Sequence, residues 1–287
     1  MLTDEQRDFL FPRAYNAALR AGAAILEVYE HEAEYDISLK KDNSPITRAD
    51  RRAHNIIKEY LAQTRIPLLS EEGREMLYDE RRRWDLFWMV DPLDGTKEFI
   101  KGNGEFTVNI ALLADNKPVM SVVYVPYIQK IYFSVREGEA WMKDGIKADS
   151  AAEFPMDIIF GNAQSLPVTK GLNKPIRIGI SRSHNTEETF KYVEVLKKKY
   201  PDAEVVEQGS SYKFCLLAEG VLDIYVRTTN TYEWDTAAGE AVLRGSGGDV
   251  VSLPGFEPLE YNKLSLLNPN FVCRSRYMME EKLLHDK

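Results

Sequence analysis

The sequence has few cysteines and histidines, no long apolar run and no excess of basic charge. Only two cysteines, Cys215 and Cys273, occur in 287 residues, which excludes a disulfide framework and leaves packing as their plainest role. No apolar run reaches the roughly 20 residues of a membrane span. The first six residues carry acids instead of a basic region followed by an apolar one, so we expect a cytoplasmic protein without a signal peptide.

The charge balance is acidic, with 37 basic residues, 45 acidic residues and a net charge of −8. A general nucleic-acid binder needs a basic face, so this balance argues against that class, although it allows local basic pockets. The composition, 44% apolar and 29% charged, is typical of an ordinary globular protein. A chain of this length forms about one or two domains with a large core.

One stretch organises the rest of the chain. Residues 85–90 are a nearly unbroken apolar run of strand length, and they end abruptly in the turn Asp-Pro-Leu-Asp-Gly-Thr at residues 91–96. The proline fixes one backbone angle and Gly95 permits an unusual one, so Asp91 and Asp94 can converge. An ordinary turn that ends a buried strand is the commoner meaning of such a short motif, and other parts of the chain must decide.

A converging aspartate pair suits a hard cation. Mg²⁺ prefers oxygen ligands, and two carboxylates with a turn carbonyl, such as that of Leu93, supply several of its six positions. If Gly95, Thr96 and Lys97 begin a helix, their free N–H groups point at an anion beside that cation. The motif therefore predicts a combined metal and phosphate site.

The first half of the chain predicts two helices and a sheet. Thr3 and Gln6 form a capping-box pattern before an amphipathic helix over about residues 4–31, and Thr47 can cap a second helix that runs to about residue 63. After the central motif the apolar period changes to two, which predicts an antiparallel meander. The expected strands cover residues 35–40, 67–70, 106–113, 119–125, 130–135 and 139–142.

Residues 144–174 follow neither periodicity and contain several prolines and glycines, so we place a domain boundary there. The predicted units are an N-terminal α+β domain (1–145), a connecting segment (146–174) and a C-terminal α/β domain (175–287), in which strands and helices alternate. The expected strands of the last unit cover residues 176–181, 203–207, 221–226, 249–253 and 270–274, and its helices cover residues 186–200, 211–219 and 235–244.

Acidic residues stand at four separate element ends: Asp50, the pair Glu71 and Glu72, the motif pair, and Asp235. An ordinary N-cap explains Asp235 as well as a metal ligand does, and a solvated turn explains Glu72. Each acid alone has such a plain explanation, and only their joint pattern points to a site.

The joint pattern resembles the signature of the inositol monophosphatase superfamily of Mg²⁺-dependent phosphatases. It consists of Glu71-Glu72, the motif at residues 91–96, and Trp-Asp-Thr-Ala-Ala-Gly at residues 234–239. The resemblance spans nearly the whole chain and implies an α/β, layered αβαβα sugar-phosphatase fold with the active site between two domains. The stretches most similar to the 3′(2′),5′-bisphosphate nucleotidases of the bacterial CysQ type are residues 43–47, 97–99, 181–184 and 209–215.

The resemblance also implies two or three Mg²⁺ ions. Glu71, Asp91 and the Leu93 carbonyl would hold one ion, and Asp91, Asp94 and Asp235 a second, so that Asp91 bridges the pair. Two such ions stabilise the attacking and leaving oxygens of an in-line displacement, without a covalent phospho-enzyme.

Catalytic roles follow from the same resemblance. Thr96 would orient the nucleophilic water with Asp50 as the proton acceptor. Glu72 would steer a further metal through a water molecule.

Substrate contacts are less clear from the residues alone. Lys213 lies in the first turn of an expected helix, where a cation opposes the helix dipole unless an anion is bound. An exposed lysine lying over the core is the alternative, and His184 alone would be a capping or surface residue. By resemblance, the substrate contacts are Gly95, Thr96, His184, Ser210, Ser211, Lys213, Arg227 and Asp235, of which Ser210, Ser211, Lys213 and Arg227 would bind the nucleotide's 5′-phosphate.

Three functions are compatible with these residues. The first is removal of the 3′-phosphate from adenosine 3′,5′-bisphosphate, a by-product of sulfate assimilation, and residues 97–98 and 210–214 favour it. The second is an inositol or other sugar monophosphatase. The third is a metal-binding regulatory protein without catalysis, which the intact acidic set disfavours. We expect a small nucleotide as partner, no nucleic acid and no membrane span, and a homodimer is compatible with the sequence.

Overall fold

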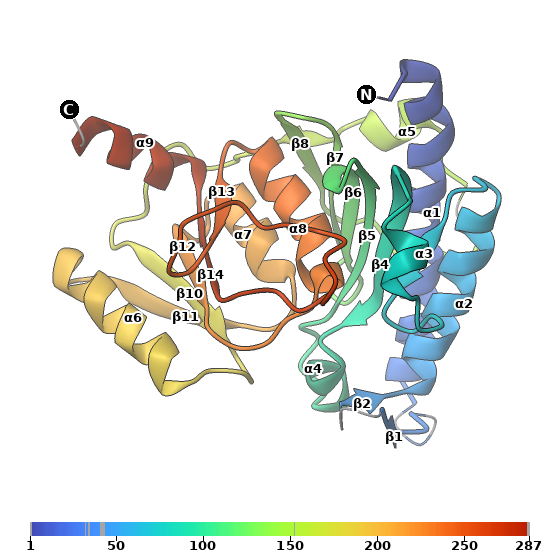
Figure 1. The fold of residues 1–287 in the computed structure, drawn as a ribbon, viewed down its shortest axis with the longest axis horizontal. Helices are drawn as coiled ribbons and strands as arrows, with labels where there is room; N and C mark the ends of the chain where they lie inside the picture. Colours follow the sequence, from blue (N-terminus) through green and yellow to red (C-terminus); the bar gives the residue numbers. More distant parts are fainter. Residues whose placement is uncertain (1, 32, 34, 41–43, 152, 286–287) are drawn as a thin grey trace.

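The computed structural model describes residues 2–31, 33, 35–40, 44–151 and 153–285. Its elements are stacked in the order helix, sheet, helix, sheet, helix (Figure 1), so the expected αβαβα architecture is confirmed. None of the described helices combines the length and the apolar character that crossing a membrane requires.

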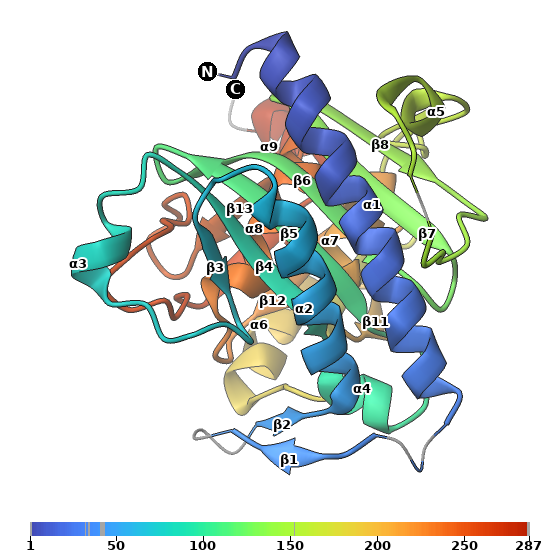
Figure 2. The same ribbon diagram turned by 90° about the vertical axis from the view of Figure 1, so that its right-hand side faces the viewer.

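Two helices form the first layer. The first, α1 (Asp4–Tyr29), begins after the expected capping box of Thr3 and Gln6, and α2 (Arg48–Ala62) begins after Thr47. Both lie across one face of the larger sheet (Figure 2). A short hairpin of β1 (Ser38–Leu39) and β2 (Pro45–Ile46) precedes α2.

The larger sheet has seven strands in the order β3-β4-β5-β6-β7-β8-β9. Strand β3 runs parallel to β4, and the later neighbours pair antiparallel, as the meander predicts. The strands are β3 (Leu68–Ser70), β4 (Leu86–Asp94), β5 (Thr107–Ala114), β6 (Lys117–Val125), β7 (Lys130–Arg136), β8 (Glu139–Lys143) and β9 (Gln164–Ser165).

Three short helices accompany this sheet: α3 (Tyr78–Arg81), α4 (Thr96–Ile100) and α5 (Met156–Phe160). No element was expected within residues 144–174, yet α5 and β9 lie there. Ile159 of α5 is fully buried in the α1 core, and β9 pairs with β8 at the edge of the sheet. Both elements are too short to show a period in the sequence.

Two helices, α7 (Tyr212–Glu219) and α8 (Glu233–Gly245), lie between the sheets (Figure 1). They approach closely because α8 has small residues. A Cβ atom on Gly239 would lie 2.6 Å from a ring carbon of Phe214. The free thiols of Cys215 and Cys273 are buried, which confirms their packing role.

The second sheet has five strands in the order β11-β10-β12-β14-β13, and α6 (Glu187–Lys199) and α9 (Arg276–His285) form the outer layer. The strand expected at residues 221–226 starts later, because the N–H groups of Val221 and Leu222 bind Leu216 O in the turn after α7. Helix α9 was not expected. The strands are β10 (Arg177–Ser181), β11 (Glu204–Gln208), β12 (Ile224–Arg227), β13 (Asp249–Ser252) and β14 (Phe271–Arg274).

Candidate active site

The apolar sequence of β4 follows from its cover on both faces. Trp88 and Val90 lie in the core on the α1 side, whereas Phe87 and Met89 lie in the core shared with α7 and α8. Successive side chains of a strand point to opposite faces. Asp91 continues the second row and therefore faces α8.

A β-bulge brings Asp94 to the same face. Asp91 pairs with Asn109 and Asp94 pairs with Thr107, so β4 has one residue more than β5 in this interval. Strict alternation would place the two aspartates on opposite faces. Gly95 then ends the strand with φ +96°, and a Cβ atom there would lie 2.9 Å from Glu105 O, so both conformation and space require glycine.

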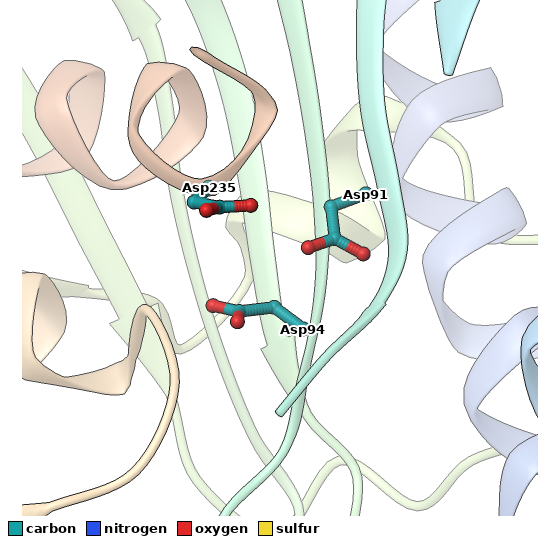
Figure 3. Close-up of side chains that lie close together, drawn as sticks. All are labelled: Asp91, Asp94 and Asp235. Carbon is teal, nitrogen blue, oxygen red and sulfur yellow. The ribbon is translucent and has the colours of Figure 1, made fainter. Parts of the chain in front are cut away.

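Asp235 reaches the same space from the start of α8. Its Oδ2 accepts a hydrogen bond from Tyr232 N at 2.8 Å, so it also caps the helix. One carboxylate oxygen from each of Asp91, Asp94 and Asp235 lies within 4.8 Å of the others. Figure 3 shows the three side chains around a common space.

Glu71 completes the acidic set. It follows β3, which pairs in parallel with β4, and its N–H donates a hydrogen bond to Val90 O at 3.1 Å, next to Asp91. Its carboxyl group interacts with that of Asp91. Lys40 Nζ lies 2.7 Å from Glu71 Oε1 and also contacts Glu72. Burial, followed by the charge of Glu71, raises the pKa of Glu72 to about 7.

The acidic cluster is electrostatically strained. Burial, followed by the neighbouring carboxylates, raises the pKa values of Asp91 and Asp235 well above their usual range. Buried like charges are costly unless a cation is present. The donors are anionic oxygens, and Leu93 lines the same cavity, so the cluster fits a hard divalent ion such as Mg²⁺.

Thr96 and Asp50 lie next to this cluster and contact each other. Thr96 Oγ1 donates a hydrogen bond to Asp50 Oδ1 at 3.0 Å, across 46 positions of sequence. Asp50 is 1% exposed, and its Oδ2 accepts a hydrogen bond from Thr47 N at 2.7 Å. Burial raises the pKa of Asp50 by more than its hydrogen bonds with Thr47 lower it, so the net shift is upward.

One cavity of about 220 Å³ contains both the acidic cluster and a group of basic side chains. Of the residues expected at the site, Asp50 and Glu72 are not part of its lining. The expected residues that line it are Glu71, Asp91, Leu93, Asp94, Gly95, Thr96, His184, Ser210, Ser211, Lys213, Arg227 and Asp235.

Lys213 is only 2% exposed, so the alternative of an exposed lysine is wrong. Its Nζ donates hydrogen bonds to Gln208 O at 2.9 Å and to Ser210 O at 2.6 Å. Burial, followed by the charge of Arg227, lowers the pKa of Lys213 to about 7. A buried cation beside a second cation suits an anionic ligand.

His184 lies at the basic side of the cavity. Its Nε2 is 2.8 Å from Lys97 Nζ, and burial with the surrounding cations, Arg227 first, lowers its pKa to about 4. At neutral pH the imidazole is therefore uncharged and accepts a hydrogen bond from the lysine.

The model of the inositol monophosphatase family matches residues 6–286. The chain belongs to the inositol monophosphatase family. It is 41% identical over 257 residues to the 3′(2′),5′-bisphosphate nucleotidase CysQ of Escherichia coli O6:H1, covering 88% of this chain and 95% of the relative. The CysQ of Buchnera aphidicola is 38% identical over 261 residues, with 89% and 90% covered. The crystal structure of CysQ from Bacteroides thetaiotaomicron matches with a TM-score of 0.84 and 45% identity, covering 92% of this chain and 96% of that chain.

Asn109 of this inositol monophosphatase family member was missed by the sequence analysis. It lies on β5, and its Nδ2 donates a hydrogen bond to Ser211 Oγ at 2.9 Å. Ser211 in turn contacts Asp94 through its N–H, at 2.6 Å, and its hydroxyl group. A polar residue within a strand that is otherwise apolar was the one feature of the sequence that could have revealed Asn109, because buried polar groups need hydrogen-bond partners.

Residues 255–268 hold the start of α8. Glu233 is fully buried, and it accepts hydrogen bonds from Asn262 N at 2.5 Å and from Lys263 N at 3.1 Å. Lys263 Nζ adds an ion pair at 2.6 Å. These contacts fix the backbone two residues before Asp235.

Proposed function

We propose that this family member is a Mg²⁺-dependent 3′(2′),5′-bisphosphate nucleotidase that hydrolyses the 3′-phosphate of adenosine 3′,5′-bisphosphate to AMP and phosphate. The proposal rests on one cavity that contains a carboxylate cluster together with a buried lysine and a buried arginine. A substrate with two phosphates matches it, because one phosphate can meet the basic side chains while the other meets the metal ligands. The identity to the CysQ relatives supports the same activity.

We assign the metal site to the carboxylates of Glu71, Asp91, Asp94 and Asp235 and the carbonyl of Leu93, with Asp91 shared by two ions. When bound, two Mg²⁺ ions stabilise the charge on the attacking and leaving oxygens of the phosphate ester. In this structure Lys40 neutralises part of the negative charge of Glu71, so metal binding competes with this ion pair. Glu72 is our candidate for orienting a third ion through water.

Thr96 and Asp50 move the proton of the attacking water. The Thr96 hydroxyl donates its hydrogen to Asp50, which leaves its oxygen free to accept one from water. As the water oxygen attacks phosphorus, its proton passes to Thr96 Oγ1 while the threonine proton passes to Asp50. The bond between phosphorus and the 3′-oxygen breaks, and this oxygen leaves with the electron pair and takes up a proton from solvent water. The raised pKa of Asp50 makes its carboxylate a better proton acceptor than an ordinary aspartate.

The phosphate that stays on the nucleotide is assigned to Lys213 and Arg227, with Ser210 beside them. Arg227 is 9% exposed and donates hydrogen bonds to Thr229 O and Asn230 O, both at 3.3 Å. These bonds hold the guanidinium group at the cavity. His184 is placed to contact the nucleoside between the two phosphates.

A small panel of phosphate esters tests this function. Phosphate release should be much faster from adenosine 3′,5′-bisphosphate than from 3′-AMP or inositol 1-phosphate, and it should need Mg²⁺. An enzyme that prefers inositol 1-phosphate would instead be a sugar monophosphatase. No release from any ester at saturating Mg²⁺ would support the regulatory alternative.

A further inference from the structure

Four elements meet at the hydroxyl group of Ser211. This hydroxyl contacts Asp94 Oδ2 at the end of β4, and it lies 2.7 Å from Asp235 O at the start of α8. Asn109 of β5 donates to the same oxygen at 2.9 Å. Ser211 itself precedes α7. The group therefore joins both aspartates to the middle helix layer and the larger sheet.

The geometry also sets the direction of the hydroxyl hydrogen. A hydroxyl group has one hydrogen to donate and two lone pairs. Because Asn109 Nδ2 donates to the oxygen, the hydrogen is left for the acceptors, the Asp94 carboxylate and the Asp235 carbonyl. Asn109 is 1% and Ser211 is 2% exposed, so bulk water does not replace these bonds.

Two donors on one carboxylate oxygen restrict the orientation of Asp94. The N–H of Ser211 lies 2.6 Å from Oδ2, and the hydroxyl binds the same atom. Hydrogen bonds to a charged acceptor are stronger than neutral ones. Partners of this kind around metal-binding carboxylates typically change metal affinity or activity 10- to 100-fold when they are removed.

We propose that Asn109 and Ser211 are positioning residues that hold Asp94 for Mg²⁺, and that Ser211 does not bind the substrate phosphate. The proposal rests on the metal site assigned above. The N–H of Ser211 donates to Asp94, and its hydroxyl hydrogen lies between Asp94 and the Asp235 carbonyl, so neither donor is left for a phosphate. Lys213 and Arg227 bind the remote phosphate without it.

Mg²⁺ binding without substrate tests this proposal. Tm rises with the Mg²⁺ concentration c as ln(1 + c/Kd), so a fit gives an apparent Kd, here called the Mg²⁺ midpoint, for each variant, whether or not the enzyme is active. Ser211→Ala should raise the midpoint about tenfold, and Asn109→Leu should raise it as well. Asn109→Ala, which leaves a cavity instead of filling it, is a second variant at that position and should do the same.

Ser246→Ala is the matched control. Ser246 is also 2% exposed, and its hydroxyl donates to Leu243 O at the other end of α8, outside the cavity lining. Its midpoint should stay within about twofold of wild type, as expected for sites that share no partners. A Ser211→Ala midpoint that also stays within twofold would overturn the proposal. If the variant then also had a raised KM at saturating Mg²⁺, Ser211 would be a substrate-binding residue.

A double-mutant cycle tests whether Asn109 acts through Ser211. Asn109→Leu should shift the Mg²⁺ midpoint in wild type but by less than about twofold in the Ser211→Ala background, because the shared bond is already lost. Equal shifts in both backgrounds would overturn the coupling. A wild-type Tm that does not respond to Mg²⁺ would instead refute the metal site, and hence the proposed function.

Discussion

The remote phosphate allows a quantitative test of specificity at Lys213. Two of its three ammonium N–H groups donate to the carbonyls of Gln208 and Ser210, and the third is available to a phosphate oxygen. Lys213→Met removes this bond and a positive charge but keeps most of the side-chain volume. Because Lys213 also supports the turn at residues 208–210, the variant should lose some activity on every substrate.

The ratio of kcat/KM values separates these two effects. Damage to the turn lowers kcat/KM for adenosine 3′,5′-bisphosphate and for 3′-AMP alike, whereas a lost phosphate contact lowers only the first. A hydrogen bond to a charged group contributes about 1.5–3 kcal/mol, and about 1.4 kcal/mol is a factor of ten. The ratio should therefore fall about ten- to a hundredfold.

Initial rates of phosphate release from the two substrates give the ratio. Lys130→Met is the control, because Lys130 is a half-buried lysine that pairs with Glu219 outside the cavity lining. Its ratio should equal that of wild type. A Lys213→Met ratio within twofold of wild type would refute Lys213 as a phosphate ligand.

The pH dependence gives the same test without a mutation. Burial lowers the pKa of Lys213 to about 7, and an amine loses its charge as the pH rises through its pKa. Since kcat/KM reports groups of the free enzyme, the wild-type ratio should decline above about pH 7. The ratio of Lys213→Met should not follow this decline, and a wild-type ratio that rises above pH 7 would contradict the assignment.

Three further perturbations address the metal site and the proton acceptor. Asp91→Asn should abolish turnover, and turnover within about tenfold of wild type, or ~1.4 kcal/mol, would contradict a bridging ligand. In EDTA the same change should raise Tm by a few degrees, since it relieves buried repulsion and ~1 kcal/mol corresponds to about 2–4 °C. Thr96→Ala should lower kcat about a hundredfold or more without moving the Mg²⁺ midpoint of Tm, and a matching loss of metal affinity would show that Thr96 is misassigned. The stability of the metal-free protein should fall as the pH rises above about 4, because folded Asp91 and Asp235, with their raised pKa values, keep protons that the unfolded chain has released. Saturating Mg²⁺ should remove that trend, and a flat profile in EDTA would refute the repulsion.

The sequence predicts the site best where a local rule determines the geometry. Thr47 and Asp50 are spaced three residues apart, which is the spacing of a capping box at the start of a helix. In the structure they form this capping box, and it fixes the orientation of the Asp50 side chain. The apolar run before Asp91 predicts a strand covered on both faces. The β-bulge that brings Asp94 beside Asp91 is consistent with the glycine and proline of the motif.

Contacts between distant segments could not be predicted in this way. The bond from Ser211 N to Asp94 spans 117 positions, and the bond from Asn109 to Ser211 spans 102. Both depend on how the middle helices pack against the larger sheet, which no local period encodes. The burial of Lys213 depends on the same packing.

The identity of the phosphate that leaves tests the proposed function most directly. Adenosine 3′,5′-bisphosphate is incubated with the enzyme, once with Mg²⁺ and once with EDTA, and the nucleotide product is separated by chromatography. We expect 5′-AMP and one equivalent of phosphate with Mg²⁺, and unchanged substrate with EDTA. Formation of 3′-AMP would contradict the orientation of the substrate between Asp91 and Lys213. Equal hydrolysis in EDTA would contradict the role of the metal.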